Sequence, residues 1–541
     1  MRVGLWAVVG GAATGIVLFL AARPATPERQ APIDGFAPAH VAAQHEVERR
    51  IAGAISTRRL AADHRFLTAE PHIAGSPRDR ALAEWTRDQW IAAGLDSVEI
   101  VEHKVLLPYP RDASVEMTGP PPSRADARFG GQAVWHATLR EHPDDPLAFH
   151  AYGASGDVTA PVVAAGTGAP EDFDRLAASG IDLHGKIVLV RYPARYSYRG
   201  YAVYLAQQRG AAAVLMYASH SDDVPDDAIQ RGGVGFDFLE PGDPSPAARP
   251  KRTILLASWD AEEYAMTSST EWVEQHEREL REHAVAYLNV DAAVSGSTFY
   301  ARAVPSLAHL VASTAGVDDA AIETRIGAGS DYTAFLNFAG VPIVDMRFQG
   351  AYPVYHSAYD THEWVERVDA GFARHAQLTR IWATVATRLA NADVLPFDDI
   401  RYAHRIGDFL TEVERRWGAP LHLASDALDR FDAAASRHAD AAAAALADDN
   451  PGALDLINRA LMEVEPSFID PAGLDSRPWY RHLLFAPAFT YQPEVLPGLS
   501  EAVDSRDPKR VAEAERRLAE ALDRAAACLK VFTTFPGSRA S

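Results

Sequence analysis

The chain has 541 residues, enough for two to four domains with large hydrophobic cores. Its 52 basic and 73 acidic side chains give a net charge of −21, which argues against nucleic acid as a partner because phosphate binding needs a basic surface. A single cysteine, Cys528, excludes an intrachain disulfide and a CxxC zinc site.

The amino terminus carries an uncharged, mostly apolar run from Gly4 to Ala22, followed by a polar, proline-rich stretch to about Pro38. A run of this length can cross a hydrocarbon core of ~30 Å as a helix. A cleaved signal peptide and an uncleaved membrane anchor are both open, with the length slightly favouring the anchor. Either interpretation predicts export, with the remaining chain membrane-anchored outside the cytoplasm, secreted or periplasmic.

The first folded segments are predicted to be helical. Apolar residues recur at helix spacing through residues 39–70, and a second helix is expected over 79–93, stopped by Gly94. The β-branched run at 98–101 predicts a strand.

The sequence pattern changes from about residue 107 to 246 and indicates a separate, β-rich domain. Short apolar runs predict strands at 157–164, 185–190 and 213–216, separated by Gly, Pro and Asp. A helix is expected over 201–209. This pattern is typical of an insert with its own small core.

A mixed α/β pattern resumes after Arg252. Buried strands are expected at 253–258, 284–290 and 341–346, with a helix over 269–282. Strands of nearly continuous apolar character that alternate with helices predict an α/β fold, with a mostly parallel sheet covered by helices on both faces.

The remainder, after Pro396, is predicted to be a helical bundle. Alanine-rich stretches at 432–447 and 511–527 favour helix by propensity alone.

Polar side chains that suit metal chemistry follow the predicted strands. Glu262 and Glu263 come after the first strand, Asp291 ends the second, and His356 lies in a loop past the third. The acidic pair alone is a weak signal, since carboxylates commonly begin helices. Carboxylates and an imidazole that converge on one sheet edge are, however, the ligand types that zinc takes.

The chain resembles the glutamate carboxypeptidase and transferrin receptor family, whose members join a zinc exopeptidase domain, a protease-associated (PA) domain and a helical dimerisation domain. The matching stretches occur in the same order and run nearly end to end: 71–75, 90–98, 106–110, 253–263, 269–272, 352–356, 394–398, 468–471 and 477–482.

The resemblance implies the following domain organisation: a signal peptide or membrane anchor (1–22), a linker (23–38), the first part of the peptidase domain (39–106), a truncated PA domain (107–247), a peptidase domain lacking its opening section (248–398) and a helical dimerisation domain (399–541). A homodimer through the last of these is an expectation from the family alone.

The resemblance also implies roles for the polar residues. Glu262 matches the general base, Glu263 and His356 match ligands of one zinc, and Asp291 matches a ligand of the other. Working members hold two zincs that share and acidify one water, which attacks the peptide carbonyl.

Four residues match positions that approach substrate: Arg199 in the PA domain, Arg347, Tyr355 and Tyr491. A structural surface role is equally open for Arg199. The family's other pocket arginine aligns with Asp345, and its carboxylate-reading lysine aligns with Thr490, so a preference for glutamate is not expected here.

Working members of the family have a section between the PA domain and the strand of the paired glutamates. That section supplies one histidine ligand and the aspartate that bridges both metals. It is absent here, since only a few residues separate Pro244, in the PA domain, from Arg249. The segment His220-Ser-Asp222 has the residue types of the missing ligand motif, but it lies inside the PA insert. The sequence therefore predicts a protein of the zinc carboxypeptidase type whose peptidase activity is impaired or lost. We expect it to bind one zinc ion or none. A non-catalytic, receptor-like member is the alternative, and an internal deletion from an active parent is a third possibility.

Overall fold

The computed structural model describes residues 31–103, 105, 107–108, 114–117, 123–126, 150–192, 199–218, 232–234, 254–357, 359–448 and 450–529. The apolar run at 4–22, the motif at 220–222 and the junction between Pro244 and Arg252 lie outside these residues. Within the described part of the chain, no helix is both long and apolar enough to cross a membrane.

Three helices open the fold: α1 (Val41–Ala54), α2 (Thr57–Leu67) and α3 (Pro77–Ala92). The hydroxyl of Ser56 accepts a hydrogen bond from the Arg59 N–H at the start of α2, and Ser76 does the same for α3. The predicted helices are confirmed. The strand predicted at 98–101 is wrong, since these residues have no regular structure and no strand partner among the described residues.

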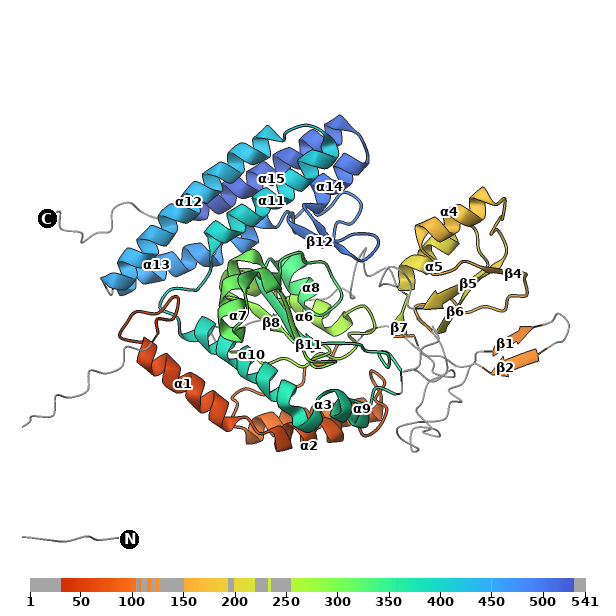
Figure 1. The fold of residues 1–541 in the computed structure, drawn as a ribbon, viewed down its shortest axis with the longest axis horizontal. Coiled ribbons are helices and arrows are strands. Elements are labelled where there is room, and N and C mark those ends of the chain that lie inside the picture. Colours follow the sequence, from red (N-terminus) through yellow and green to blue (C-terminus); the bar gives the residue numbers. More distant parts are fainter. Residues whose placement is uncertain are drawn as a thin grey trace, which may run out of the picture.

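The predicted PA domain lies at the right of Figure 1. Its centre is a parallel sheet of order β4-β5-β6, formed by Val162–Ala164, Ile187–Tyr192 and Ala213–Ala218. Helices α4 (Pro170–Ala178) and α5 (Arg199–Gln208) complete the small hydrophobic core of this domain. The strands and helix predicted here are confirmed. Short strands form two more pairs, β1 (Ser114–Met117) with β2 (Ser123–Asp126) and β3 (His150–Ala151) with β7 (Gly232–Gly233).

The predicted peptidase domain is built on a four-stranded sheet of order β10-β9-β11-β8. Its strands are β8 (Tyr287–Asn289), β9 (Thr298–Ala303), β10 (Ile322–Glu323) and β11 (Ile343–Gln349). The β11–β8 and β10–β9 pairs are parallel, and the central β11–β9 pair is antiparallel. The sheet is therefore mixed, with two parallel pairings out of three.

The segment at 254–258 is not a strand, contrary to the prediction. Ile254 and Leu255 are each 50% exposed, and β8 is the edge of the sheet as described. An apolar run becomes a buried strand only where neighbouring strands supply its hydrogen-bond partners. No such neighbour stands beside 254–258 in the described residues.

Helices pack around this sheet (Figure 1). They are α6 (Thr267–His283), α7 (Ala308–Ala315), α8 (Tyr332–Ala334), the π-helical turn η4 (Phe335–Ala339), α9 (His362–Val368) and α10 (Ala373–Asn391). Helix α6 and strands β8 and β11 confirm the helix predicted over 269–282 and the strands predicted at 284–290 and 341–346.

The carboxyl-terminal domain is helical, as predicted, and lies against the peptidase domain at the top of Figure 1. Its helices are α11 (Asp399–Trp417), α12 (His422–Ala447), α13 (Pro451–Met462), α14 (Pro497–Asp504) and α15 (Pro508–Cys528), with a hairpin of β12 (Phe485–Pro487) and β13 (Pro493–Val495). Short 3₁₀ turns join the elements: η2 (Pro305–Leu307), η3 (Asp319–Ala321), η5 (Ala370–Phe372) and η6 (Glu465–Phe468).

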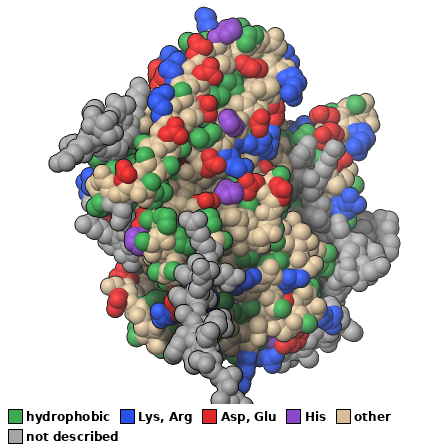
Figure 2. Space-filling model, turned by 60° about the vertical axis from the view of Figure 1, so that its left-hand side comes forward, with side chains coloured by type: hydrophobic (Ala, Val, Ile, Leu, Met, Phe, Trp, Pro, Cys, Tyr) green, Lys and Arg blue, Asp and Glu red, His purple; other side chains and the backbone are tan. Residues whose placement is uncertain are grey.

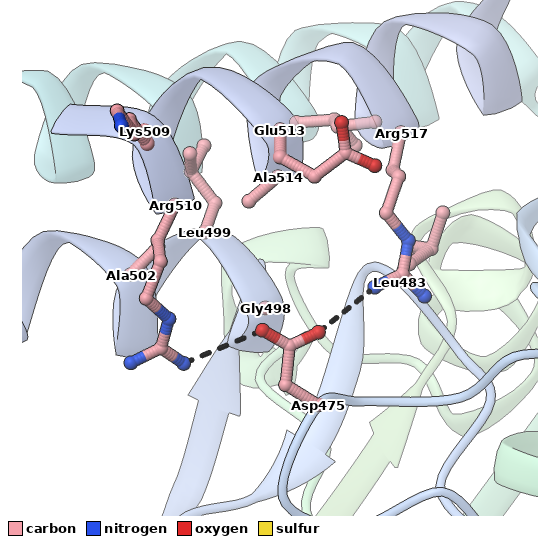
Figure 3. A pocket seen from close by; sticks show the side chains of 11 residues that line it. Asp475, Leu483, Gly498, Leu499, Ala502, Lys509, Arg510, Glu513, Ala514 and Arg517 are labelled. Carbon is pink, nitrogen blue, oxygen red and sulfur yellow. Dashed lines mark hydrogen bonds and ion pairs between the residues drawn. The ribbon is translucent and has the colours of Figure 1, made fainter. Parts of the chain in front are cut away.

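A cavity of about 210 Å³ lies between α14 and α15 of the helical domain, close to the loop of Asp475. Figure 3 shows that Asp475 accepts hydrogen bonds from Arg510 and Arg517 at its edge, each at 3.4 Å. None of the predicted site residues lines it.

The visible surface carries both signs of charge. On the face shown in Figure 2, Lys and Arg side chains are scattered among Asp and Glu and do not form one basic patch. That face offers no electrostatic footprint for nucleic acid.

Candidate functional site

The paired glutamates lie in a tight turn just before α6. Ala261, Ala265 and Met266 in this turn all have positive φ angles of 55° to 63°, although none is glycine. Such backbone costs on the order of 1–3 kcal/mol per residue and is concentrated at functional sites. Asp260 secures the start of the turn, because its Oδ1 accepts a hydrogen bond of 2.6 Å from the Ala261 N–H. Glu262 and Glu263 are consecutive residues of this turn.

Glu263 and His356 are brought together, as their predicted roles require. His356 Nε2 lies 2.6 Å from Glu263 Oε1, although 93 positions separate the two in sequence. His356 itself has a φ of 59°, in a loop closed by the Ser357 N–H to Val354 carbonyl hydrogen bond. Burial acts to raise the pKa of Glu263, but His356 and then Arg199 outweigh it, so this pKa is lowered and the carboxylate is ionised.

Asp291 follows β8 on the same side of the site. Burial raises its pKa, the Ser330 hydroxyl opposes this by hydrogen bonding, and the nearby charges of Asp345 and Glu263 raise it further. The Ser330 hydroxyl also accepts a hydrogen bond of 2.9 Å from Asn289 Nδ2. Asp291 is therefore near Glu263 and is oriented by the loop that carries Ser330.

Asp331 is a site residue that the sequence reasoning missed. Burial and the neighbouring Asp291 raise its pKa to about 7, despite hydrogen bonding to Ser269. The signal for it was present in the sequence, since Gly327 and Gly329 form a glycine-rich loop that ends in Ser330-Asp331 after β10. A carboxyl group with this pKa beside Asp291 adds negative charge to the site whenever it ionises.

The predicted pocket residue Arg347 lies next to a second arginine that the prediction did not include. The guanidinium carbons of Arg347 and Arg302 lie 4.9 Å and 5.4 Å from the centre of the Tyr300 ring. Arg302 Nε is 3.9 Å from Oδ2 of the buried Asp345, whose Oδ1 accepts from Asn289 Nδ2 at 3.0 Å. The aspartate at the family's arginine position is thus neutralised from the adjacent strand.

The remaining predicted residues lie around this centre. Tyr355 is partly exposed, and its ring centre is 3.8 Å from that of His356. Tyr491, with a φ of 69°, reaches across from the helical domain to Gly329, where a Cβ would be 3.3 Å from its ring. Arg199 is 7% exposed, and its Nη2 lies 3.8 Å from Glu263 Oε2.

These donors fit a zinc ion only in part. Glu263 and His356 are suitable ligands in contact, but zinc sites in proteins have three or four protein ligands. Among the residues that the structure describes, no group of three or more His, Cys, Asp or Glu side chains lies close enough to hold a metal ion.

Three family models match the chain, and the first two overlap over residues 202–242. The PA domain matches residues 158–242, peptidase family M28 matches residues 202–379, and the transferrin receptor-like dimerisation domain matches residues 420–530. This combination, in this order, is the one that the sequence resemblance predicted. The chain is thus similar to the glutamate carboxypeptidase and transferrin receptor family in all three of its domain types.

Family members are similar to this chain over different spans. A probable glutamate carboxypeptidase from Arabidopsis thaliana, LAMP1, is 37% identical over 283 residues, which is 48% of this chain and 41% of that protein. The match therefore spans less than half of that relative. A probable glutamate carboxypeptidase from Zea mays, VP8, is 26% identical over 607 positions, covering 82% of this chain and 83% of the relative.

The alignment with VP8 is longer than the 541 residues of this chain. The maize family member consequently carries internal segments that have no counterpart here. An inactive zinc metalloprotease from Schizosaccharomyces pombe is 30% identical over 306 residues, covering 51% of this chain and 38% of that protein. The family thus includes proteins named as peptidases and one named as inactive.

Proposed function

We propose that this chain is a metallopeptidase-family protein with an incomplete two-metal centre, whose hydrolysis of peptides is weak or absent. The observation that carries the proposal is the contact between Glu263 and His356 without a third close ligand among the described residues. A single zinc held by two protein side chains would bind loosely, because each lost ligand or supporting group weakens metal affinity. One zinc or none is the expected content.

Glu262, next to Glu263 in the same turn, is the residue to which the resemblance gives the role of proton acceptor. Arg347 and Tyr355 would orient the peptide, as the resemblance implies. The substrate class that fits is a short peptide, cleaved near its carboxyl terminus.

The first testable prediction concerns zinc content and hydrolysis. We expect the full chain, purified in detergent and equilibrated with zinc, to hold fewer than two zinc ions by elemental mass spectrometry. We also expect it to release little or no carboxyl-terminal residue from acetylated dipeptides. Two zincs per chain, with hydrolysis abolished by Glu262→Gln, would contradict the proposal. Glu323→Gln, in β10, serves as the matched control substitution.

A second candidate function is a non-catalytic, dimeric peptide-binding protein, as in the receptor branch of the family. The match of the dimerisation domain over residues 420–530, combined with the incomplete donor set, favours this reading. Export is part of both proposals, with residues 4–22 as signal or anchor. Peptide binding that persists in Glu262→Gln without turnover would distinguish the binding protein from a weak enzyme.

A further inference from the structure

The cavity of the helical domain has an apolar floor of a size that suits a small ligand. It measures about 210 Å³ and lies between α14 and α15, beside the loop of Asp475 (Figure 3). Three leucines and an alanine that line it are at most 7% exposed: Leu483, Leu499, Leu518 and Ala502. An apolar cavity of about 150 Å³ is enough to bind benzene. The space here therefore admits a group the size of a benzene ring, with room for one small polar group.

The mouth of the cavity carries more positive than negative charge. Three basic and two acidic residues line it: Lys509, Arg510, Arg517, Asp475 and Glu513. Both oxygens of Glu513 are already held by Arg516, which lies outside the lining. Lys509 has no ionic partner among the residues that the structure describes. The cavity thus combines an apolar floor with a mouth that favours an anion.

Asp475 holds its two arginines at the mouth only through long contacts. Its carboxylate oxygens lie 3.4 Å from Arg510 Nη2 and 3.4 Å from Arg517 Nη1. Both contacts are weak, because hydrogen bonds between charged groups are normally about 2.7–2.9 Å long. Arg517 also has a shorter contact, at 2.7 Å, with Asp470. Arg510 is therefore the guanidinium that a second carboxylate can engage with little loss.

We propose that this cavity binds a small monocarboxylate whose apolar body is about the size of a benzene ring. The apolar body packs on the buried leucines and is held there by the hydrophobic effect. The carboxylate stays at the mouth, where the guanidinium of Arg510 donates two parallel hydrogen bonds to it and Lys509 adds a second positive charge. None of the predicted site residues lines the cavity, so this inference is independent of zinc binding and peptide hydrolysis.

The test uses phenylacetate, 2-phenylethanol and 2-phenylethylamine, which share one apolar body and differ in charge. Binding to the full chain in detergent is measured by saturation-transfer NMR and by the rise in Tm that a ligand of the folded state causes. For a ligand of about ten heavy atoms we expect a Kd on the order of 1 mM. Phenylacetate should bind about tenfold more tightly than the alcohol, because it alone makes charged hydrogen bonds, and the amine should bind most weakly. An alcohol or an amine that binds as tightly as the acid would overturn the inference.

Two substitutions locate the binding in this cavity. Arg510→Gln, at a half-exposed position that the fold does not depend on, should weaken phenylacetate about tenfold and leave the alcohol unchanged. Ala514→Phe fills the space between the helices and should abolish the binding of both. Arg459→Gln and Ala512→Phe, at exposed helix positions outside the lining, are the matched controls and should bind as wild type. Wild-type affinity in Arg510→Gln contradicts the proposal. So does a wild-type chain that binds no phenylacetate, as it would if a side chain of a second copy filled the cavity.

Discussion

Asp399, at the start of α11, is a buried carboxyl group without a hydrogen-bond donor. It is 6% exposed, and neither of its side-chain oxygens has a partner within the described residues. Burial, reinforced by the charges of Glu465 and Asp398, raises its pKa to about 8. Glu465, by contrast, accepts hydrogen bonds from the Tyr402 hydroxyl at 2.6 Å and from His482 Nε2 at 3.0 Å. The domain therefore buries a protonated Asp399 at neutral pH.

This burial makes stability depend on pH in a defined direction. The unfolded carboxyl group ionises near ~4, whereas the folded one holds its proton up to about 8. The folded state binds the extra proton in that window, so stability is greatest below the unfolded pKa and is lost as pH rises through the folded pKa. Asp399→Asn removes the titration, and we expect it to be more stable than wild type by about 2 kcal/mol at pH ~8.

Thermal unfolding at pH ~4 and pH ~8 checks this prediction, because the advantage of the asparagine should shrink at the lower pH. Asp408→Asn, an exposed position of the same helix, should leave the pH dependence of wild type unchanged. A variant that loses stability equally at both pH values would show that Asp399 is held in the ionised form by a donor.

Helices α2 and α9 are joined by a hydrogen bond between two histidines. His64 Nδ1 lies 2.9 Å from His362 Nδ1, and His362 Nε2 lies 2.9 Å from Arg65 Nη2. Arginine can only donate, so His362 Nε2 accepts and its proton sits on Nδ1, which donates to His64. Burial, with His362 and His375 nearby, lowers the pKa of His64 to about 4.

We therefore expect the packing of α2 against α9 to weaken as the pH falls. Unfolded histidine takes up a proton below pH ~6.5, whereas folded His64 resists until about 4, so stability present above the unfolded pKa is lost as pH falls through this window. Leu60 and Ala61 of α2 pack with the cluster around Val354, in the loop of His356, so that loop should loosen with the helix.

Hydrogen exchange at pH ~5 and pH ~7.5 measures this release. We expect faster exchange of α2 and of residues 352–357 at the lower pH in wild type, and a smaller pH effect in His64→Phe, whose ring cannot titrate. His404→Phe, an exposed position on α11, is the control. An equal acid response in wild type and His64→Phe would assign the effect to other groups.

The sequence predicted helices better than strands, for a physical reason. Ser56 and Ser76 are the N-cap residues of helices α2 and α3, and an N-cap depends only on neighbouring residues, so it can be recognised in the sequence. The runs at 98–101 and 253–258 have strand composition, but a strand also needs a partner that composition does not reveal. Contacts such as Arg302 with Asp345, or His64 with His362, depend on side chains meeting across elements and were not predictable. The contact between Glu263 and His356 was predictable, because the resemblance assigned both residues to one metal.

At the scale of the molecule, the helical domain and the peptidase domain share one hydrophobic core, whereas the PA domain has its own. Polar contacts cross the shared boundary too: Trp479 Nε1 donates to Glu274 of α6 at 2.6 Å, and Arg481 pairs with Glu277 at 2.9 Å. These two domains should unfold together. The PA domain has a separate core and meets the site through Arg199.

The shared core leaves apolar side chains on the outer surface of the helical domain, and these are candidates for the dimer contact. Leu423 of α12 is 54% exposed and Leu456 of α13 is 39% exposed, both within the matched dimerisation region. We expect the full chain in detergent to have about twice the 58.7 kDa mass of one chain, by light scattering corrected for bound detergent. A monomeric mass would contradict the assignment of the domain as a dimerisation module.

Charged substitutions locate the contact. Burying a carboxylate without a partner costs several kcal/mol, so a glutamate at a dimer interface should shift the equilibrium to monomer. We expect Leu423→Glu or Leu456→Glu to halve the mass, whereas Leu95→Glu, exposed outside the helical domain, should leave it unchanged. A dimer that survives both substitutions would move the contact to another face of the helices, because neither leucine could then lie inside it.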